Sequence, residues 1–128
     1  DGRRDLVLTN ANEPRVQLFK NTLKRSNSVL AIRLEGAMRS SRSGSGDASN
    51  RDAIGARVEV YSGGRRHVAE LRAGEGLAAQ NSAEVLIGLG PSPSVERIRV
   101  RWPSQKESLI ERPAVVRGGR TSLTVREP

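Results

Sequence analysis

The stretch NRDAIGARVEVYSGGRRHVAELRAG, residues Asn50–Gly74, decides how this chain folds. Polar and apolar residues alternate on both sides of the pair Gly63-Gly64. Such a pair predicts a β-hairpin, because both central positions of a primed two-residue turn require positive φ angles, which glycine adopts without strain. The turn also sets the register, in which Ser62 faces Arg65 and the other pairs follow in step.

This register gives the hairpin one small aliphatic face and one charged face. The residues predicted to point into the core are Ala56, Val58, Val60, His67, Ala69 and Leu71. On the opposite face Arg57 lies across from Glu70, and a cross-strand pair of opposite charge favours this register. Tyr61 lies beside Arg66 on that face and is placed for a cation–π contact.

Further short segments with the composition or alternation of β-strands lie between turn residues. They are residues 5–10, 15–20, 29–35, 84–89, 95–102, 107–112 and 121–126. Their inward positions include Leu30, Ile32, Leu34, Ile98, Val100, Trp102, Leu123 and Val125, with Trp102 as the expected anchor of the core. Because no segment shows helical periodicity, we expect an all-β protein, an antiparallel β-sandwich or barrel-like domain of about nine short strands.

The composition limits the class of protein. The chain has 128 residues, the size of one ordinary domain, and 35% of them are hydrophobic. It contains no cysteine, which excludes disulfides, thiolate nucleophiles and cysteine-based zinc sites. No apolar run approaches the roughly 18 residues of a membrane span, and the opening DGRRDLVL lacks the pattern of a signal peptide. From the abrupt start on Asp1 we expect a fragment of a longer chain.

The formal net charge of +8 permits weak attraction to polyanions. Specific nucleic-acid binding is not expected, because the basic residues are scattered and only three residues are aromatic. The outward positions of the segment VERIRVRW are Arg97, Arg99 and Arg101, which form a candidate contact for acidic polysaccharides.

The segment RSSRSGSGDAS, residues 39–49, consists almost wholly of Ser, Gly, Arg and Asp. It cannot bury enough apolar area to offset the entropy that is lost when a segment becomes ordered. We therefore interpret it as a flexible insertion in solvent, with a basic phosphate-binding arm as the alternative.

The candidates for catalysis are few. His67 is the only histidine, and its predicted inward position beside the tight turn provides no evident nucleophile for a Ser-His-Asp site. The 14 carboxylates are distributed singly along the chain, so a carboxylate-dependent hydrolase is an alternative without a predicted acid–base pair. The glycine-containing stretches lack the strand–loop–helix context of phosphate-binding motifs. We expect a protein that is not an enzyme.

Three residues at the start of the opening stretch, Asn50, Asp52 and Gly55, are candidates for a site or for a turn. Asn and Asp side chains build turns by bonding the backbone two residues on, and glycine permits a bend or a close approach of two backbones. The structural interpretation is that they shape the approach to the hairpin, and a ligand or interdomain contact is the alternative.

Several separated blocks resemble the ASPIC/UnbV domain, and they place such a domain at residues 23–128. In order they are NRDAIGARVEV, GGRRHVAELRAGEG, QNS, IGLG, VERIRVRWPS and LTVRE. Leu77 and Ile87 stand where that family usually has aromatic residues. Gln105 stands where its turn usually has glycine, and a positive φ angle there would cost about 1 kcal/mol. Residues 1–22, beginning DGRRDLVLTN, resemble the end of an FG-GAP/VCBS repeat, which forms a β-propeller blade.

The resemblance implies a non-catalytic accessory or interaction domain in an extracellular or cell-envelope protein, which serves adhesion or ligand display beside a β-propeller. Its partners would be upstream propeller repeats of the same chain and a protein or polysaccharide ligand, and a glycan-binding module for acidic polysaccharides is the alternative. The resemblance also implies that Asp1 and Asp5 match two ligand positions of a calcium loop. Two carboxylates with two arginines between them would bind calcium poorly alone.

Overall fold

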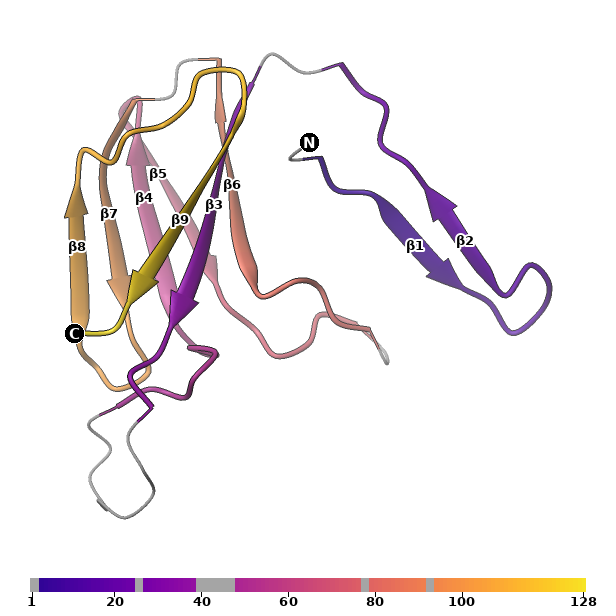
Figure 1. Ribbon diagram of the computed structural model, residues 1–128, viewed down its shortest axis with the longest axis horizontal. Coiled ribbons are helices and arrows are strands. Elements are labelled where there is room, and N and C mark those ends of the chain that lie inside the picture. The colour runs from indigo at the N-terminus through magenta and orange to yellow at the C-terminus, as the bar shows by residue number, and fades with distance from the viewer. Residues whose placement is uncertain (1–2, 25–26, 39–47, 77–78, 92–93) are drawn as a thin grey trace.

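The computed structural model describes residues 3–24, 27–38, 48–76, 79–91 and 94–128. Within these ranges the chain forms nine β-strands and no helix (Figure 1). The strands are β1 (Leu6–Thr9), β2 (Val16–Phe19), β3 (Ser28–Glu35), β4 (Arg57–Ser62), β5 (Arg65–Glu70), β6 (Glu84–Gly90), β7 (Val95–Arg101), β8 (Glu107–Glu111) and β9 (Arg120–Arg126). The prediction of an all-β protein with about nine short strands is confirmed.

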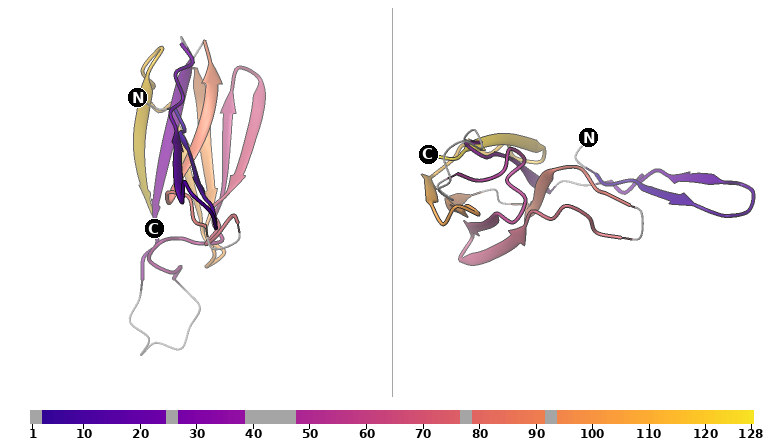
Figure 2. Two further views of the ribbon diagram at one scale, coloured as in Figure 1. Left: turned by 90° about the vertical axis from the view of Figure 1, so that its right-hand side faces the viewer. Right: turned by 90° about the horizontal axis from the view of Figure 1, so that it is seen from below.

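The strands form three sheets, and two of these are stacked as the layers of a sandwich. The strand order is β6-β3-β9 in one layer and β5-β4-β7-β8 in the other (Figure 2). The third sheet is the hairpin β1–β2, which projects to one side of the sandwich (Figure 1). Within the described ranges, neither β1 nor β2 contacts a strand of the sandwich.

The hairpin β4–β5 has the predicted register, with Arg57 opposite Glu70. Gly63 and Gly64 have φ angles of 57° and 71°, as a primed turn requires. Val58 is fully buried while Arg57 is exposed, so the aliphatic and charged faces point as the sequence indicates. The alternation of side chains and the chemistry of the turn therefore agree in the folded protein.

Two contacts expected on the charged face are made with other partners. The predicted contact of Tyr61 with Arg66 is wrong, because the guanidinium of Arg97 on β7 lies 4.0 Å from the centroid of the Tyr61 ring. Arg57 forms its ion pair with Glu59 of its own strand, at 3.4 Å, rather than across the hairpin. Strand β4 lies between β5 and β7, so each of its outward side chains has neighbours on two sides.

Strand β3 is the centre of the three-stranded layer and pairs antiparallel with β6 but parallel with β9. The parallel pair departs from the antiparallel arrangement expected from the sequence. Parallel neighbours cannot be joined by a hairpin, and here all the strands from β4 to β8 lie between the two in the chain. Because the two strands are far apart in the chain, no turn sequence between them indicates that they pair.

The two layers enclose one apolar core. Its buried members are Leu30, Ile32, Leu34, Ala53, Ala56, Val58, Val60, Leu71, Val85, Ile87, Leu89, Val95, Ile98, Val100, Trp102 and Val125. Trp102 is 1% exposed and is the largest of the fully buried side chains. Its Nε1 donates a hydrogen bond to Oγ of Ser108 at 2.8 Å, so the one polar atom of the indole is satisfied.

The turn between β7 and β8 is closed by a hydrogen bond from the N–H of Gln105 to the carbonyl of Trp102, at 2.9 Å. Gln105 has a φ angle of 71°, in the left-handed region that favours glycine. The strain expected for this position is therefore present. Leu77, which stands where the family usually has an aromatic residue, lies outside the described residues.

Replacing Gln105 by glycine should raise the free energy of unfolding by about 1 kcal/mol, because glycine adopts this conformation without a Cβ clash. Urea unfolding followed by circular dichroism measures the change. Gln105→Ala is the matched control, since alanine keeps the Cβ. An equal gain in both variants would show that the strain at this position is not the cause.

Candidate functional site

The segment that leads into β4 is shaped by the side chain of Asn50. Its Oδ1 accepts a hydrogen bond from the N–H of Ile54 at 2.8 Å, and its Nδ2 donates to the carbonyl of Ile54 at 2.9 Å. The backbone carbonyl of Asn50 also accepts from the N–H of Ala53 at 2.9 Å. Asn50 therefore organises a turn, as its residue type indicates.

Gly55 and Asp52 contribute to this segment in different ways. Gly55 has a φ angle of 94°, and its N–H donates to the carbonyl of Leu71 at 2.8 Å, which fastens the turn to the end of β5. Asp52 is exposed, and in the described part of the chain its carboxylate makes no hydrogen bond. Of the three candidates, Asn50 and Gly55 shape the approach to the hairpin, whereas Asp52 faces solvent.

A buried carboxylate, which the sequence analysis did not single out, connects this segment to the rest of the domain. Glu127 follows β9 and is 8% exposed. Its carboxylate accepts hydrogen bonds from the N–H of Ala37 at 2.7 Å and from the N–H and Oγ of Ser49, both at 2.9 Å. The hydroxyl of Ser104, in the β7–β8 turn, donates to the same carboxylate. One side chain thus joins three separate parts of the chain.

Ser49 lies at the end of the insertion that the sequence predicts to be flexible. Residues 39–47 are outside the described residues, but Ser49 is buried and holds the carboxylate of Glu127. The prediction is therefore wrong at this end of the insertion. A serine beside a polar, low-complexity sequence can still be buried when a distant carboxylate accepts its hydrogen bonds.

The same hydrogen bonds determine the ionisation of Glu127. Burial would raise the pKa of the carboxyl group, but the hydrogen bonds from Ser104, Ala37 and Ser49 stabilise the charged form and hold the pKa at about 2. The carboxylate is therefore ionised and fully bonded at neutral pH. A signal for it was present in the sequence, since Glu127 continues the inward positions Leu123 and Val125 of the last strand.

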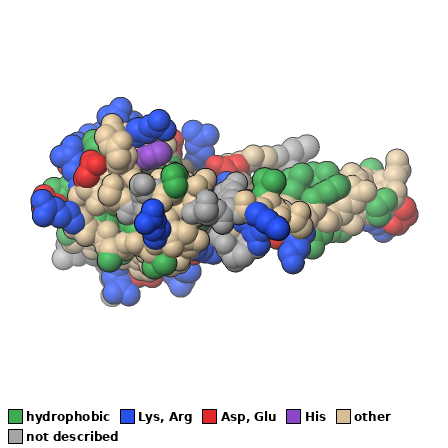
Figure 3. Space-filling model, turned by 90° about the horizontal axis from the view of Figure 1, so that it is seen from above, with side chains coloured by type: hydrophobic (Ala, Val, Ile, Leu, Met, Phe, Trp, Pro, Cys, Tyr) green, Lys and Arg blue, Asp and Glu red, His purple; other side chains and the backbone are tan. Residues whose placement is uncertain are grey.

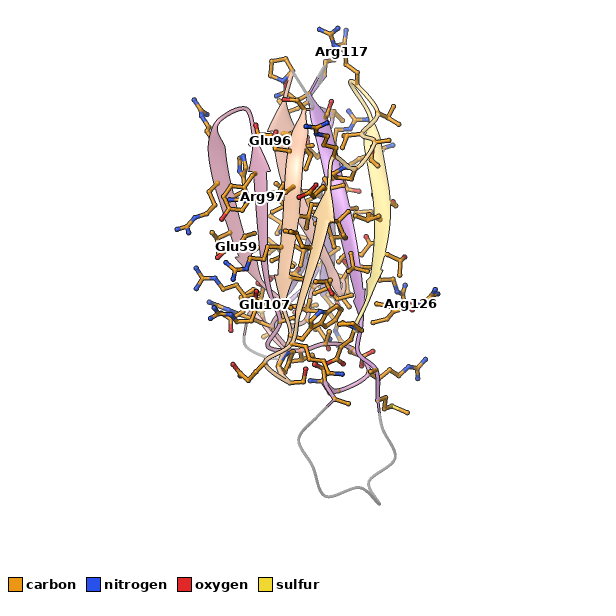
Figure 4. The ribbon with its side chains drawn as sticks, turned by 90° about the vertical axis from the view of Figure 1, so that its left-hand side faces the viewer. Glu59, Glu96, Arg97, Glu107, Arg117 and Arg126 are labelled. Carbon is orange, nitrogen blue, oxygen red and sulfur yellow. The ribbon has the colours of Figure 1, made fainter. Side chains whose placement is uncertain are left out.

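The outward face of the four-stranded layer, which we call the arginine face, carries the candidate polyanion contact (Figure 4). Its residues lie in rows across the strands from β5 to β8. The rows are Glu70–Arg57–Arg101–Glu107, then Val68–Glu59–Arg99–Leu109, then Arg66–Tyr61–Arg97–Glu111. Positive and negative side chains are therefore interleaved on this face rather than separated.

Arg97, Arg99 and Arg101 point outward as predicted, but their partners differ. Arg99 forms a bidentate pair with Glu107, with N–O distances of 2.8 and 3.1 Å, and Arg101 lies 3.5 Å from the same carboxylate. The hydrogen bonds between Arg99 and Glu107 raise the pKa of Arg99 and lower that of Glu107. Arg97 has no carboxylate partner among the described residues and lies over the Tyr61 ring.

A hollow of about 100 Å³ near the end of β5 brings several carboxylates together. They are Glu70, Glu75 and Glu84, and their partners are Arg72, Asn81 and Arg120, respectively. His67 is half-buried on β5. The hydrolase alternative could draw on such carboxylates or on His67, and each of the three carboxylates is bonded to or paired with a neighbouring side chain.

The predicted calcium ligands lie near the start of the chain. Asp1 is outside the described residues, and Oδ1 of Asp5 accepts a hydrogen bond from the N–H of Asn21 at 2.7 Å. Among the residues that the structure describes, no group of three or more His, Cys, Asp or Glu side chains could hold a metal ion. Since calcium takes about six to eight oxygen ligands, the described residues alone do not fit a calcium site.

The hairpin β1–β2 exposes apolar side chains on both of its faces. Leu6, Leu8 and Phe19 lie on one face, and Val7, Val16 and Leu18 lie on the other. Figure 3 shows hydrophobic side chains along this projecting hairpin. An isolated two-stranded hairpin is at best marginally stable in water, and strands that are apolar on both faces are typical of sheets covered on both sides.

The stacked sheets and the projecting hairpin define an all-β domain of the sandwich type. The chain matches the ASPIC and UnbV family over residues 46–128, and it belongs to that family. No curated protein and no solved structure matches the chain. The match covers β4 to β9, so the assignment of residues 1–22 to an FG-GAP/VCBS repeat stays a prediction. In the described ranges no helix is long and apolar enough to cross a membrane.

Proposed function

We propose that this chain is a non-catalytic accessory domain of an extracellular or cell-envelope protein, which lies beside a β-propeller and serves adhesion or ligand display. The observation that carries the proposal is the hairpin β1–β2, which is apolar on both faces and free of the sandwich. Membership of the ASPIC and UnbV family supports it, because the resemblance to that family implies an interaction domain that follows propeller repeats.

The hairpin needs a partner that covers it on both faces. Each face presents three exposed apolar side chains, and burying such side chains contributes about 25 cal/mol per Å² of apolar surface. The blades of a β-propeller are four-stranded sheets arranged around a central channel, so each blade has a neighbour on either face. A hairpin that completes a blade would therefore be covered on both sides, which makes preceding strands of the same protein the proposed partner.

The ends of the hairpin are already fastened in a way that suits this role. Oδ1 of Asp5 accepts from the N–H of Asn21 at 2.7 Å, and Nη1 of Arg3 donates to the carbonyl of Leu23 at 2.9 Å. These contacts link the residues before β1 to those after β2. The chain thus leaves the hairpin next to where it enters, and it continues to β3 of the sandwich.

Replacing Leu18 by lysine in the full-length natural protein tests whether preceding strands cover the hairpin. Leu18 is 69% exposed here, so in an unpartnered hairpin the change would alter the free energy of unfolding by no more than about 0.5 kcal/mol. If the hairpin is covered, a buried ammonium group should lower the stability by about 2–4 kcal/mol. Urea unfolding of the whole protein measures the difference.

Val68→Lys is the matched control, because Val68 is an exposed apolar strand residue on the arginine face. It should change the stability by no more than about 0.5 kcal/mol. Equal effects of Leu18→Lys and Val68→Lys would show that the hairpin is not covered, and the proposed attachment to a propeller would then be abandoned.

A glycan-binding module for acidic polysaccharides is the second candidate function. The observation that favours it is Arg97, whose guanidinium is held over Tyr61 and has no carboxylate partner in the described part of the chain. The two candidates are compatible, because the hairpin and the arginine face belong to different sheets.

A further inference from the structure

We infer that the arginine face holds a subsite for one acidic sugar unit, with Arg97 as the residue that binds the acid group. This inference deepens the proposed function and rests on it, since it requires that the domain acts by binding a ligand. It assigns the contact with the acid group to Arg97 alone, rather than to Arg97, Arg99 and Arg101 together. Three features of this face support it: the distribution of unpaired charge, the orientation of the Arg97 side chain, and a hollow beside that side chain.

Unpaired positive charge is concentrated in one row of the arginine face. The row from Glu70 to Glu107 carries two arginines and two glutamates, and the next row carries Glu59 and Arg99, so both rows are balanced. The row beside the Gly63–Gly64 turn carries Arg66 and Arg97 against the carboxylate of Glu111. The nearby carboxylate of Glu96 points at the turn, where its Oε1 accepts from the N–H of Gly64 at 3.4 Å. Glu111 lies across from Arg97 but outside ion-pair distance in the described structure.

The side chain of Arg97 is oriented before any ligand binds. Its guanidinium lies 4.0 Å from the centroid of the Tyr61 ring, and a cation stacked on an aromatic face loses part of its freedom to rotate. The hydroxyl of Tyr61 donates to Glu59 at 3.1 Å, which holds the ring in place. The guanidinium presents its N–H groups as a planar fork, which matches the two oxygens of a carboxylate or sulfate group.

A hollow of about 280 Å³ adjoins this guanidinium. Its lining residues are Tyr61, Arg97, Arg99, Glu107, Ser108 and Leu109. The volume is slightly below the roughly 300–1,000 Å³ that small-molecule sites occupy. Leu109 is 59% exposed and provides an apolar wall, while the paired side chains of Arg99 and Glu107 provide polar groups within reach. This combination suits a sugar ring, which has apolar C–H faces and hydroxyl edges.

A polysaccharide fits these features better than a nucleic acid does. Single-stranded nucleic acids bind by stacking bases on exposed aromatic rings. The only ring on the arginine face is that of Tyr61, and Arg97 lies over it. Duplexes are bound through many phosphate contacts along a positively charged surface, whereas two of the three rows on this face are balanced in charge. The structure therefore favours a ligand that presents one acid group and one sugar ring to this face.

The test is a calorimetric titration of the protein with an oligogalacturonate, which carries one carboxylate on each sugar unit. Arg97→Gln should weaken binding about tenfold, the loss expected when one charge-assisted contact is removed. Arg101→Gln is the matched control, because it removes the same charge from the same face of β7, and it should weaken binding less than about threefold. Arg66→Gln is a second variant of the same row and should weaken binding by about threefold or more.

Three further titrations separate this site from general attraction of anions. A neutral maltooligosaccharide of the same length should not bind, and polyglutamate and single-stranded DNA should bind at least tenfold more weakly than the oligogalacturonate. Equal losses in Arg97→Gln and Arg101→Gln would overturn the inference, as would equal binding of the acidic sugar, polyglutamate and DNA. Thermal melts of the variants confirm that they are folded. The hairpin is not altered in any of them, so a failure here is distinct from a failure of Leu18→Lys.

Discussion

Replacing Glu127 by glutamine should lower the free energy of unfolding by about 3 kcal/mol at pH 7. A carboxyl pKa held at about 2, rather than at the ordinary 4.5, corresponds to a stabilisation of this size. Glutamine has nearly the shape of glutamate, but its amide N–H₂ group must face the donors Ala37, Ser49 or Ser104. Urea unfolding measures the loss, and Glu111→Gln, at an exposed carboxylate, is the matched control with an expected change of at most about 0.5 kcal/mol.

The same pair of proteins should differ in a pH-dependent way. Because folding lowers the pKa of Glu127, its ionised carboxylate stabilises the protein fully above about pH 5, and this contribution is lost as the pH falls from about 4.5 to about 2. The wild type and Glu127→Gln should therefore become equally stable near pH 2. A gap of the same size at pH 7 and pH 2, or no gap at pH 7, would contradict the role that we assign to the carboxylate.

Replacing Gly36 by alanine should lower the free energy of unfolding by about 3 kcal/mol, because the added Cβ would be overpacked against a backbone that cannot easily move. A Cβ at Gly36 would lie 2.0 Å from the carbonyl oxygen of Asn50 and 3.1 Å from Cβ of Ser49. The N–H of Gly36 donates to the carbonyl of Arg51 at 3.0 Å, so the two backbones are held together at this point. The change would push the end of β3 away from the segment that leads into β4.

Gly88→Ala is the control for this prediction, because a Cβ at Gly88 of β6 would meet nothing within 4 Å. Alanine there should leave the stability unchanged or raise it by up to about 1 kcal/mol, since glycine loses more entropy on folding. Thermal melts of the two variants give the comparison. If Gly36→Ala melted at the wild-type temperature, the close approach of β3 and Asn50 would not be important for stability.

Local pattern was sufficient for the hairpin β4–β5. Its register follows from two glycines with positive φ angles and from the alternation of side chains, and both act over a few neighbouring residues. The strain at Gln105 was expected from the resemblance to the family, whose turn usually has glycine at this position, and its φ angle of 71° agrees. The turn at Asn50 was also predictable, although the contribution expected of Asp52 is not seen.

Partners across the sheet were not predictable in the same way. Glu107 pairs with both Arg99 and Arg101 only because β8 lies next to β7, and Arg97 is left without a carboxylate partner by the same arrangement. An outward position can be inferred from alternation, but the ion pair that a side chain forms depends on which strand is its neighbour. Of the three arginines predicted to contact a polyanion, only Arg97 therefore remains as a candidate.

The amino-acid order alone was enough for the all-β class, the aliphatic core positions and the central hairpin, because each of these depends on a period of two residues and on the chemistry of short turns. The parallel pairing of β3 with β9 and the bonding of Glu127 to Ala37, Ser49 and Ser104 came from the assembled fold. They join segments that are far apart in the chain, and no local preference of the backbone or of a side chain specifies which distant groups will meet.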